Sequence, residues 1–421
     1  MFKTFGKVCV VSLLVVAMAA PIALATTARQ NSLARSGDYI NDDSNIFRWY
    51  ATLPSYSNMV MAELGTYNGF SAIDQALGIT HSCGENGKYG TWGIFLMDNV
   101  TDNSFFIVNP VFASIEMLDI YDQFVGRAFP VNKFAIQWGK EFEKLAVGLG
   151  FTRSDADIQT ADLTSDLRFT TFGGGIRADA GESAYMDVAF TVGVAGGENI
   201  PYGSFITPDT SDFDKQLVFD GALRIFYEWK DYATLVPFAE FQFLEFALEN
   251  PDLTFGSHGD KINAFRIGAA LNLDVNTNNL LVFGVEVQRM SWEPSVPDTL
   301  GAALAEFTAF YLPTFRLALE SAVKPWLTVR VGAIKSLVKG TDTYVDASEI
   351  DYTDAFFDWF LGAGFHIAEF DIDMELGPEL PFSVGYWLTG HSAYDYNYGI
   401  REPAQPADDV PISRISAIYH F

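Results

Sequence analysis

The chain has 421 residues and a formal net charge of −27, and 49% of its residues are hydrophobic and 15% aromatic. A chain this acidic is not expected to bind nucleic acid, because it has no excess of basic side chains to neutralise phosphates. After residue 25 there is no run of about 18 apolar residues, which excludes a transmembrane helix there. A membrane β-barrel fits this composition, because its apolar residues alternate with polar ones.

Residues 1–25 are predicted to be a secretory signal peptide. Lys3 and Lys7 form its positive start, and the apolar run 8–20 is too short to span a bilayer as a helix. Residues 23–25, Ala-Leu-Ala, form a small-x-small cleavage site. The mature chain is therefore expected to be exported.

A short motif follows the signal peptide. The motif consists of two acids, a Phe and then Asn-Pro-Ala-Gly-Leu. This chain aligns with it if one residue is deleted after the two acids. The matching residues are Asp42, Asp43, Phe47, Ala51 and Leu53. In this motif the chain resembles the long-chain fatty-acid channel family and the related shuttle barrels of type IX secretion. Trp49-Tyr50 stands in place of Asn-Pro, and Thr52 in place of Gly.

The resemblance implies a barrel of about fourteen strands whose amino-terminal segment plugs the lumen, sometimes beside a lateral path for apolar molecules. Here that segment is residues 26–56, which we expect to be periplasmic or lumenal. Asp42 and Asp43 would anchor the plug to inward-facing arginines of the barrel wall. The expected partners are Arg224, Arg266, Arg316 and Arg330. A simpler alternative is that the two acids cap a helix or turn.

Residues 57–421 are predicted to form one all-β domain, a transmembrane antiparallel up-and-down β-barrel. Apolar and polar residues alternate with the period of a strand, so that one face meets lipid and the other the lumen. In 305–323, for example, Phe307, Tyr311 and Phe315 are assigned to the lipid face, opposite Arg316. The segments with this pattern are 144–153, 166–179, 184–195, 217–230, 233–247, 262–274, 279–292, 305–323, 325–338, 355–369, 371–389 and 412–421.

The region between residues 57 and 140 gives a weaker pattern. Segments 58–65, 92–97 and 134–138 look like strands, and 111–126 is either a short helix or a strand with an irregular loop. Short turns alternate with long acidic loops, so both termini should be periplasmic and the strand number even. The expected number is about fourteen, with about sixteen as the alternative.

The inward face of the predicted strands carries charges of both signs. They are Arg168, Asp187, Asp220, Arg224, Glu228, Glu240, Arg266, Glu286, Arg316, Glu320, Arg330 and Asp358. One interpretation is a charged constriction of a water-filled pore. The other is a set of interior ion pairs that hold the barrel and its plug together, because an unpaired buried charge is unfavourable.

The sequence offers no clear metal or catalytic site. Acidic loops, such as the one that contains Asp342 and Asp351, lack the ligand spacing of a calcium loop, so solvated charge is the simpler interpretation. These acids could instead hold divalent ions that bridge to lipopolysaccharide phosphates. His81, His258 and His391 belong to no catalytic motif. We therefore predict neither an enzyme nor a cofactor.

These observations predict an outer-membrane barrel for passive transport or binding of small, apolar solutes. The alternatives are a general diffusion porin with a charged constriction, and a non-transporting scaffold or secretion-machine partner. The other expected partners are outer-membrane lipid, lipopolysaccharide and the barrel assembly machinery. The assembly machinery would read the closing strand 412–421, whose last aromatic residues, Tyr419 and Phe421, form the assembly signal.

The assembly signal can be tested by deleting Phe421. Because the aromatic end of the closing strand would be lost, we expect folded barrel to become scarce in the outer membrane. The measurement is the amount of heat-modifiable, protease-resistant barrel in outer-membrane fractions. Normal amounts in the deletion variant would show that Phe421 is not needed as a signal.

Overall fold

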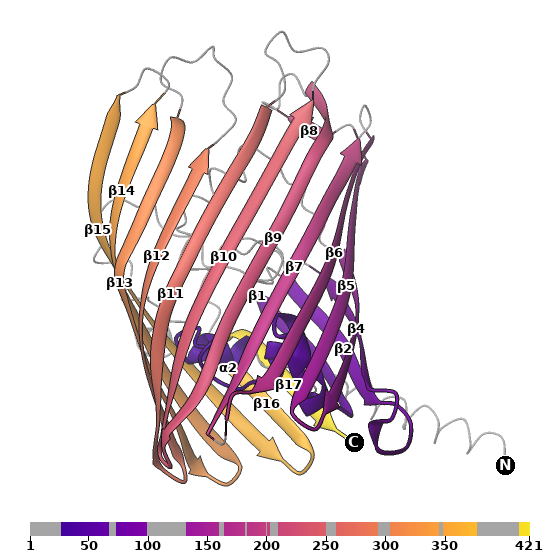
Figure 1. Ribbon diagram of the computed structural model, residues 1–421, viewed down its shortest axis with the longest axis vertical. Coiled ribbons are helices and arrows are strands. Elements are labelled where there is room, and N and C mark those ends of the chain that lie inside the picture. Colours follow the sequence, from indigo (N-terminus) through magenta and orange to yellow (C-terminus); the bar gives the residue numbers. More distant parts are fainter. Residues whose placement is uncertain are drawn as a thin grey trace, which may run out of the picture.

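The computed structural model describes residues 27–66, 73–98, 132–159, 164–181, 183–198, 200–202, 209–249, 258–293, 304–344, 348–376 and 412–421. The predicted signal peptide, segment 111–126 and His391 lie outside these residues. The described chain forms a closed antiparallel β-barrel, as predicted (Figure 1). It begins with a short segment that contains the helix α2 (Thr27–Ser32) and the 3-10 helices η2 (Asp43–Phe47) and η3 (Tyr50–Tyr56).

Sixteen strands close the barrel, so the expected number of about fourteen is wrong and the alternative of sixteen holds. They are β1 (Met59–Thr66), β2 (Ile73–Ser82), β3 (Thr91–Asp98), β4 (Asn132–Phe142), β5 (Leu145–Gln159), β6 (Thr164–Asp179), β7 (Ala184–Glu198), β9 (Asp209–Lys230), β10 (Ala233–Glu249), β11 (His258–Asn276), β12 (Asn279–Glu293), β13 (Leu304–Lys324), β14 (Leu327–Tyr344), β15 (Glu349–Ile367), β16 (Phe370–Leu376) and β17 (Ile412–His420). β1 pairs with both β2 and β17, which closes the ring. The short strand β8 (Ile200–Tyr202) pairs only with β9, and η4 (Glu85–Gly87) lies between β2 and β3.

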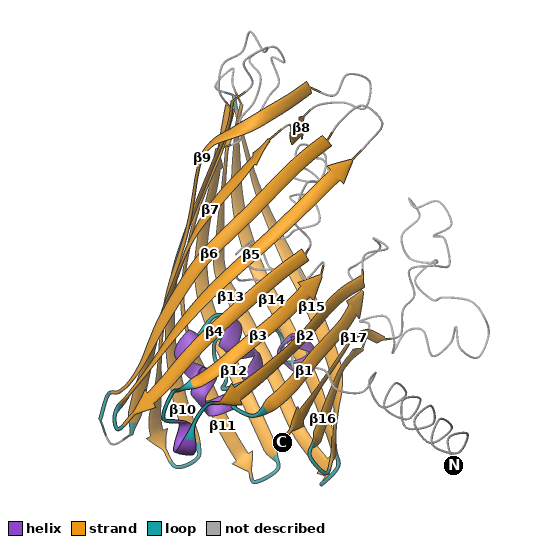
Figure 2. Cartoon of the chain, turned by 90° about the vertical axis from the view of Figure 1, so that its right-hand side faces the viewer, coloured by secondary structure: helices purple, strands orange, loops and turns teal. Residues whose placement is uncertain are grey.

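The first four strands explain the wrong number. Four strands lie between residues 59 and 142, whereas only three segments there were recognised as strand-like and the expected total of about fourteen included two of them. β2 escaped detection because its inward positions are small or polar, as at Gly78 and Thr80. The wall is correspondingly uneven, since β1–β4, β16 and β17 have 7 to 11 residues whereas β9–β15 have 15 to 22 (Figure 2).

Side chains alternate between the two faces of the wall as the period of two requires. On β9, Asp220 and Arg224 are buried inside, whereas Leu223 and Tyr227 are exposed on the outside. None of the described helices is long and apolar enough to cross a membrane.

β13 departs from the predicted alternation. Its pairing with β14 shifts register between Tyr311 and Thr314, which indicates a β-bulge. The extra residue reverses the facing, so Tyr311 is buried inside while Leu312 and Phe315 are both exposed outside. The assignment of Tyr311 and Phe307 to the lipid face is therefore wrong.

Neighbouring residues at the bulge offer a test of facing. In a Cys83→Ser background, we expect Leu312→Cys to react with a lipid-partitioning thiol probe in proteoliposomes, because its side chain points outward. Tyr311→Cys should be protected from that probe, because residue 311 lies against the inner face. Leu317→Cys is the matched outward control beyond the bulge. If the probe labelled residue 311 and spared residue 312, the register of β13 would be incorrect.

Candidate functional site: a charge belt and the segment inside it

Charged side chains encircle the inner wall of the barrel. We call the fourteen that form ion pairs the charge belt: Glu63, Arg177, Asp187, Asp220, Arg224, Glu240, Arg266, Glu286, Arg316, Glu320, Arg330, Asp373, Glu375 and Arg414. The strand register places opposite charges side by side. Arg177 of β6 is opposite Asp187 of β7, which is opposite Arg224 of β9. The attraction between each arginine and its carboxylate therefore offsets much of the free-energy cost of removing the two charges from water.

The N-terminal segment, residues 27–56, lies inside the ring of strands near the short turns (Figures 1 and 2). Its apolar side chains are buried in two clusters. Trp49 packs with Phe238 of β10 in the first, and Ile46 and Leu53 pack with Phe95 of β3 in the second. The segment therefore forms much of the hydrophobic core of the described protein.

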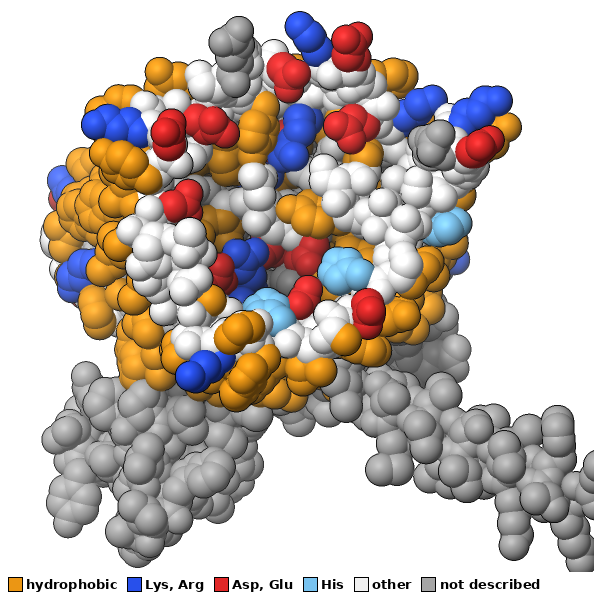
Figure 3. Space-filling model, turned by 90° about the horizontal axis from the view of Figure 1, so that it is seen from below, with side chains coloured by type: hydrophobic (Ala, Val, Ile, Leu, Met, Phe, Trp, Pro, Cys, Tyr) orange, Lys and Arg blue, Asp and Glu red, His pale blue; other side chains and the backbone are white. Residues whose placement is uncertain are grey.

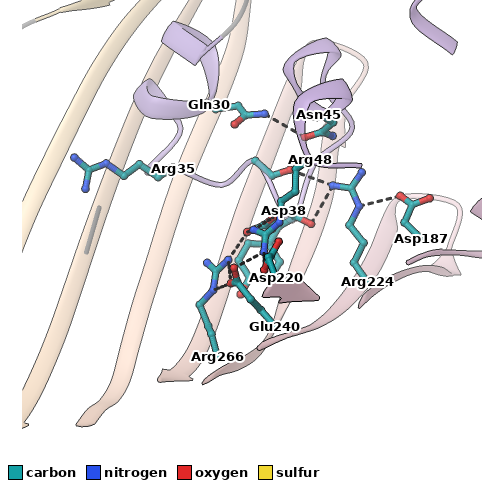
Figure 4. A network of polar contacts seen from close by, with 12 residues as sticks. Gln30, Arg35, Asp38, Asn45, Arg48, Asp187, Asp220, Arg224, Glu240 and Arg266 are labelled. Atoms are coloured by element: carbon teal, nitrogen blue, oxygen red, sulfur yellow. Dashed lines mark hydrogen bonds and ion pairs between the residues drawn. The ribbon is translucent and has the colours of Figure 1, made fainter. Parts of the chain in front are cut away.

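Asp38 is the central anionic contact between the segment and the belt. It accepts hydrogen bonds from Arg48 of the segment at 3.1 Å and from Arg266 of β11 at 2.5 Å (Figure 4). Arg48 also pairs with Glu240 and lies 3.5 Å from Asp220. The cluster therefore joins the segment to three neighbouring strands, β9, β10 and β11.

The arginines around Asp38 determine its ionisation. Burial opposes the charged form, but Arg48, Arg266 and Arg224 outweigh burial and hold the pKa of Asp38 well below its usual range. Because the folded-state pKa is lowered, Asp38 stabilises the folded state at neutral pH. That contribution is lost only as the pH falls from about 3.9, the ordinary value for Asp, through the lower folded-state pKa.

Two wall arginines bind the main chain of the segment. Arg224 donates to the carbonyl oxygens of Gly37, Asp38 and Ile40 at 3.2 to 3.3 Å. Arg316 donates to the carbonyl oxygen of Ala34 at 2.7 Å. These carbonyls lie between α2 and η2, and a buried carbonyl without a partner is unfavourable. The wall arginines therefore stabilise an irregular stretch of backbone.

The acidic pair of the motif has a different role from the one expected. Asp42 caps η2 by accepting a hydrogen bond from the Ser44 backbone N–H at 3.1 Å, and it pairs with Arg29 at 2.7 Å. Arg29 in turn pairs with Glu320 of the wall at 2.8 Å. Of the expected wall arginines, Arg266 binds Asp38 instead, and Arg224 and Arg316 bind main-chain carbonyls of the segment. Arg330 pairs with Glu320 and Asp373 of the wall. Asp43 accepts from the same backbone N–H at 3.0 Å.

Glycines occupy the wall positions that the segment approaches most closely. A Cβ atom added at Gly148 or Gly173 would lie 2.1 Å from atoms of Tyr50. One added at Gly332, on the opposite side, would lie 2.4 Å from the backbone nitrogen of Ala34. Contacts this short are incompatible with a side chain, so glycine is required for the observed approach.

Several sequence-predicted residues lie apart from this site. Arg168 shares the outward face of β6 with exposed Phe172 and Ile176, so its assignment to the lumen is wrong. Gly173 and Gly175 of β6 face Tyr50, so the odd-numbered residues of this strand point inward and the even-numbered residues, including Arg168, point outward. Glu228 and Asp358 have the parity of inward residues but are exposed.

The motif and terminal aromatics have local contacts. Phe47 packs edge-on against Phe95 with ring centroids 5.0 Å apart. Tyr419 packs against Phe370 at 4.7 Å, and Phe421 is 54% exposed. These contacts explain local packing.

Sequence reasoning missed two groups of residues. The first is Arg29, Asp38 and Arg48 of the segment, which could have been noticed because a segment inside a charged lumen needs complementary charges. The second is His366 and His420, whose rings lie 2.6 Å and 3.4 Å from the two carboxylate oxygens of Asp371. Histidine side chains border the central hollow seen from the short-turn end (Figure 3).

The described residues contain no group of three or more His, Cys, Asp and Glu side chains arranged to hold a metal ion. A cavity of about 520 Å³ lies beside the short turns of β4–β5, β6–β7 and β9–β10. Its lining includes Lys144, Asp179, Tyr185, Phe226 and Glu228. The cavity therefore lies outside the charge belt.

The sequence matches no protein-family model and no curated protein sequence. Among solved structures, the chain is similar to the FrpB iron transporter of Neisseria meningitidis (F3-3 variant), with a TM-score of 0.40 and 10% identity over 58% of this chain and 45% of that chain. It is similar to the toluene transporter TbuX of Ralstonia pickettii, with a TM-score of 0.40 and 8% identity over 94% and 97%. It is also similar to BauA, the ferric preacinetobactin receptor of Acinetobacter baumannii, with a TM-score of 0.43 and 13% identity over 76% and 54%. The chain thus spans about half the length of FrpB and BauA.

Asp38→Asn tests the anchoring of the segment. Removing one partner of a buried ion pair typically costs about 3–5 kcal/mol. Because residue 38 retains some exposure, we expect less, about 2 kcal/mol, in the free energy of holding the segment in place. A reporter cysteine at buried Thr52, in a Cys83→Ser background, should then react at least about tenfold faster with a water-soluble thiol reagent.

The matched control is Asp358→Asn, which removes the same charge from an exposed wall position. Its reporter cysteine should react as slowly as in the parent protein. Equal labelling of the Asp38→Asn variant and its parent would contradict an anchoring role for Asp38.

Proposed function

We propose that the protein is an outer-membrane β-barrel in which the N-terminal segment is a plug, and that small solutes pass when the plug moves. The observation that carries this proposal is the anchoring of one internal segment to much of the wall. Its charges pair with the belt on one side, and Tyr50 fits against glycines on the other. A segment held by salt bridges and side-chain packing, and not by the backbone ladder of the barrel, can move while the barrel stays closed.

A membrane location is supported by the outer surface of the wall. Large apolar side chains are exposed on many strands of the wall, among them Leu149, Phe172, Val194, Leu223, Ile267, Leu317 and Val331. Exposed apolar surface of this extent is unfavourable in water and suits lipid. Trp229, Tyr232 and Trp326 are exposed near the short turns, where an aromatic girdle would contact the membrane interface.

The further elements of the proposal follow from a membrane location. The short turns and both termini would be periplasmic, and the barrel assembly machinery would recognise Tyr419 and Phe421. Outer-membrane lipid would surround the wall, and lipopolysaccharide would contact its outer leaflet side. The proposal assigns no catalytic role and no cofactor.

Small apolar solutes are the proposed cargo, on the resemblance of residues 42–53 to the fatty-acid channel motif. A general porin with a charged constriction is the second candidate, and the alternating charges of the belt favour it. A scaffold that transports nothing is the third. The first two require a passage, whereas the scaffold does not.

Conductance of refolded protein in planar bilayers separates a passage from a scaffold. The test variant, which we call the released variant, is Arg29→Gln/Asp38→Asn/Arg48→Gln. It removes the three charged side chains of the segment that pair with the belt and leaves the wall unchanged, so we expect larger or more frequent conductance steps than in the parent protein. Heat-modifiability should stay unchanged, because the strand ladder is intact.

The matched control is Arg29→Lys/Asp38→Glu/Arg48→Lys, which keeps every charge and should retain more of the resting state. A released variant that folds, exposes its segment to protease and still conducts no better than the parent would overturn the plug proposal. In that case the segment would be a structural element of a scaffold.

A further inference from the structure

The charge belt is not neutral by itself. It contains six arginines, Arg177, Arg224, Arg266, Arg316, Arg330 and Arg414, against eight carboxylates. Each of these arginines pairs with at least one carboxylate of the wall. The belt alone therefore has a formal surplus of two negative charges, since eight carboxylates face six arginines.

The segment contacts three of these carboxylates with its own arginines. Arg48 pairs with Glu240 and lies 3.5 Å from Asp220, and Arg29 lies 2.8 Å from Glu320. The opposite contact, a segment carboxylate on a wall arginine, is made by Asp38 on Arg266. Arg266 also pairs with Glu240 at 2.6 Å and lies 3.6 Å from Glu286, so it keeps partners when Asp38 leaves.

Displacement of the segment would therefore affect the arginines and the carboxylates of the wall differently. Arg224 and Arg316 would lose main-chain carbonyls but keep Asp187 and Glu286, respectively. Asp220 and Glu240 would lose Arg48, and these two carboxylates lie on adjacent strands, two residues apart in the register.

We infer that the passage opened by displacing the segment selects neutral and cationic solutes and disfavours carboxylates and other anions. The inference rests on the proposed function and names the charge class of its cargo. A surplus of carboxylates in a confined lumen raises the local concentration of cations and lowers that of anions. Apolar solutes would then pass as uncharged molecules, and ionised fatty acids would be disfavoured.

The selectivity between K⁺ and Cl⁻ can be measured as the reversal potential of the released variant in a planar bilayer under a tenfold KCl gradient. We expect K⁺ to be favoured over Cl⁻ by roughly tenfold, in line with the focusing of ions by charged clefts. Adding Asp220→Asn and Glu240→Gln to the released variant should bring the ratio close to one, because these substitutions remove the two carboxylates that lose Arg48 and with them the surplus charge. Adding Glu228→Gln instead, at an exposed wall position outside the belt, is the matched control and should leave most of the preference.

A second measurement uses solutes of one shape and three charges. In swelling assays with proteoliposomes of the released variant, benzylamine and benzamide should enter faster than benzoate. The difference between their rates of entry should become smaller in the variant that also carries Asp220→Asn and Glu240→Gln. This readout does not depend on small ions.

The outcomes separate the inference from the proposal on which it rests. A conducting released variant that prefers Cl⁻, or that admits benzoate fastest, would overturn the inference and leave the plug proposal standing. Conductance no greater than that of the parent would overturn both. A K⁺ preference unchanged by Asp220→Asn and Glu240→Gln would also overturn the inference, because the selectivity would then arise elsewhere.

Discussion

The ion pairs of Asp38 with Arg48 and Arg266 are the interactions on which the interior of this barrel depends. A buried arginine without a carboxylate, or a buried carboxylate without an arginine, would be strongly unfavourable. The wall supplies more carboxylates than arginines, and the segment supplies Arg29 and Arg48. The segment is thus an electrostatic complement of the wall as well as a hydrophobic core element.

The wall holds the segment by two means, charged side chains and glycines that allow close approach, and Gly332 of β14 shows that the glycines are not confined to one side. Strands β9–β14 use charged side chains, as Arg224 and Arg316 illustrate. Strands β5 and β6 use the absence of a side chain, because Gly148 and Gly173 let Tyr50 come close. Charge pairing is directional and close packing is steric, so together they fix both the position and the orientation of the segment. Displacement would break the two kinds of contact together.

Much of the barrel could be predicted from the sequence, because strand alternation is a local property. The closed antiparallel barrel follows from twelve clear apolar–polar segments and from the loop lengths. Other features are not local. The bulge beyond Tyr311, the outward position of Arg168 and the choice of Asp38 over Asp42 as the contact of Arg266 depend on strand register and on the path of the segment. The strand β2 was missed because small inward residues such as Gly78 weaken the pattern.

The most direct measurement of the central claim is a disulfide between the segment and the closing strand. The Ala28 backbone N–H lies 3.2 Å from the Ser416 hydroxyl oxygen, inside the barrel. In a Cys83→Ser background, Ala28→Cys/Ser416→Cys should form an intrachain disulfide under mild oxidation and hold the segment in the lumen. The pair Ala28→Cys/Ile415→Cys, with residue 415 on the opposite face of β17, should not. The account predicts a cross-link in the first pair alone; none in the first pair, or equal cross-linking in both, would contradict a segment seated inside the barrel.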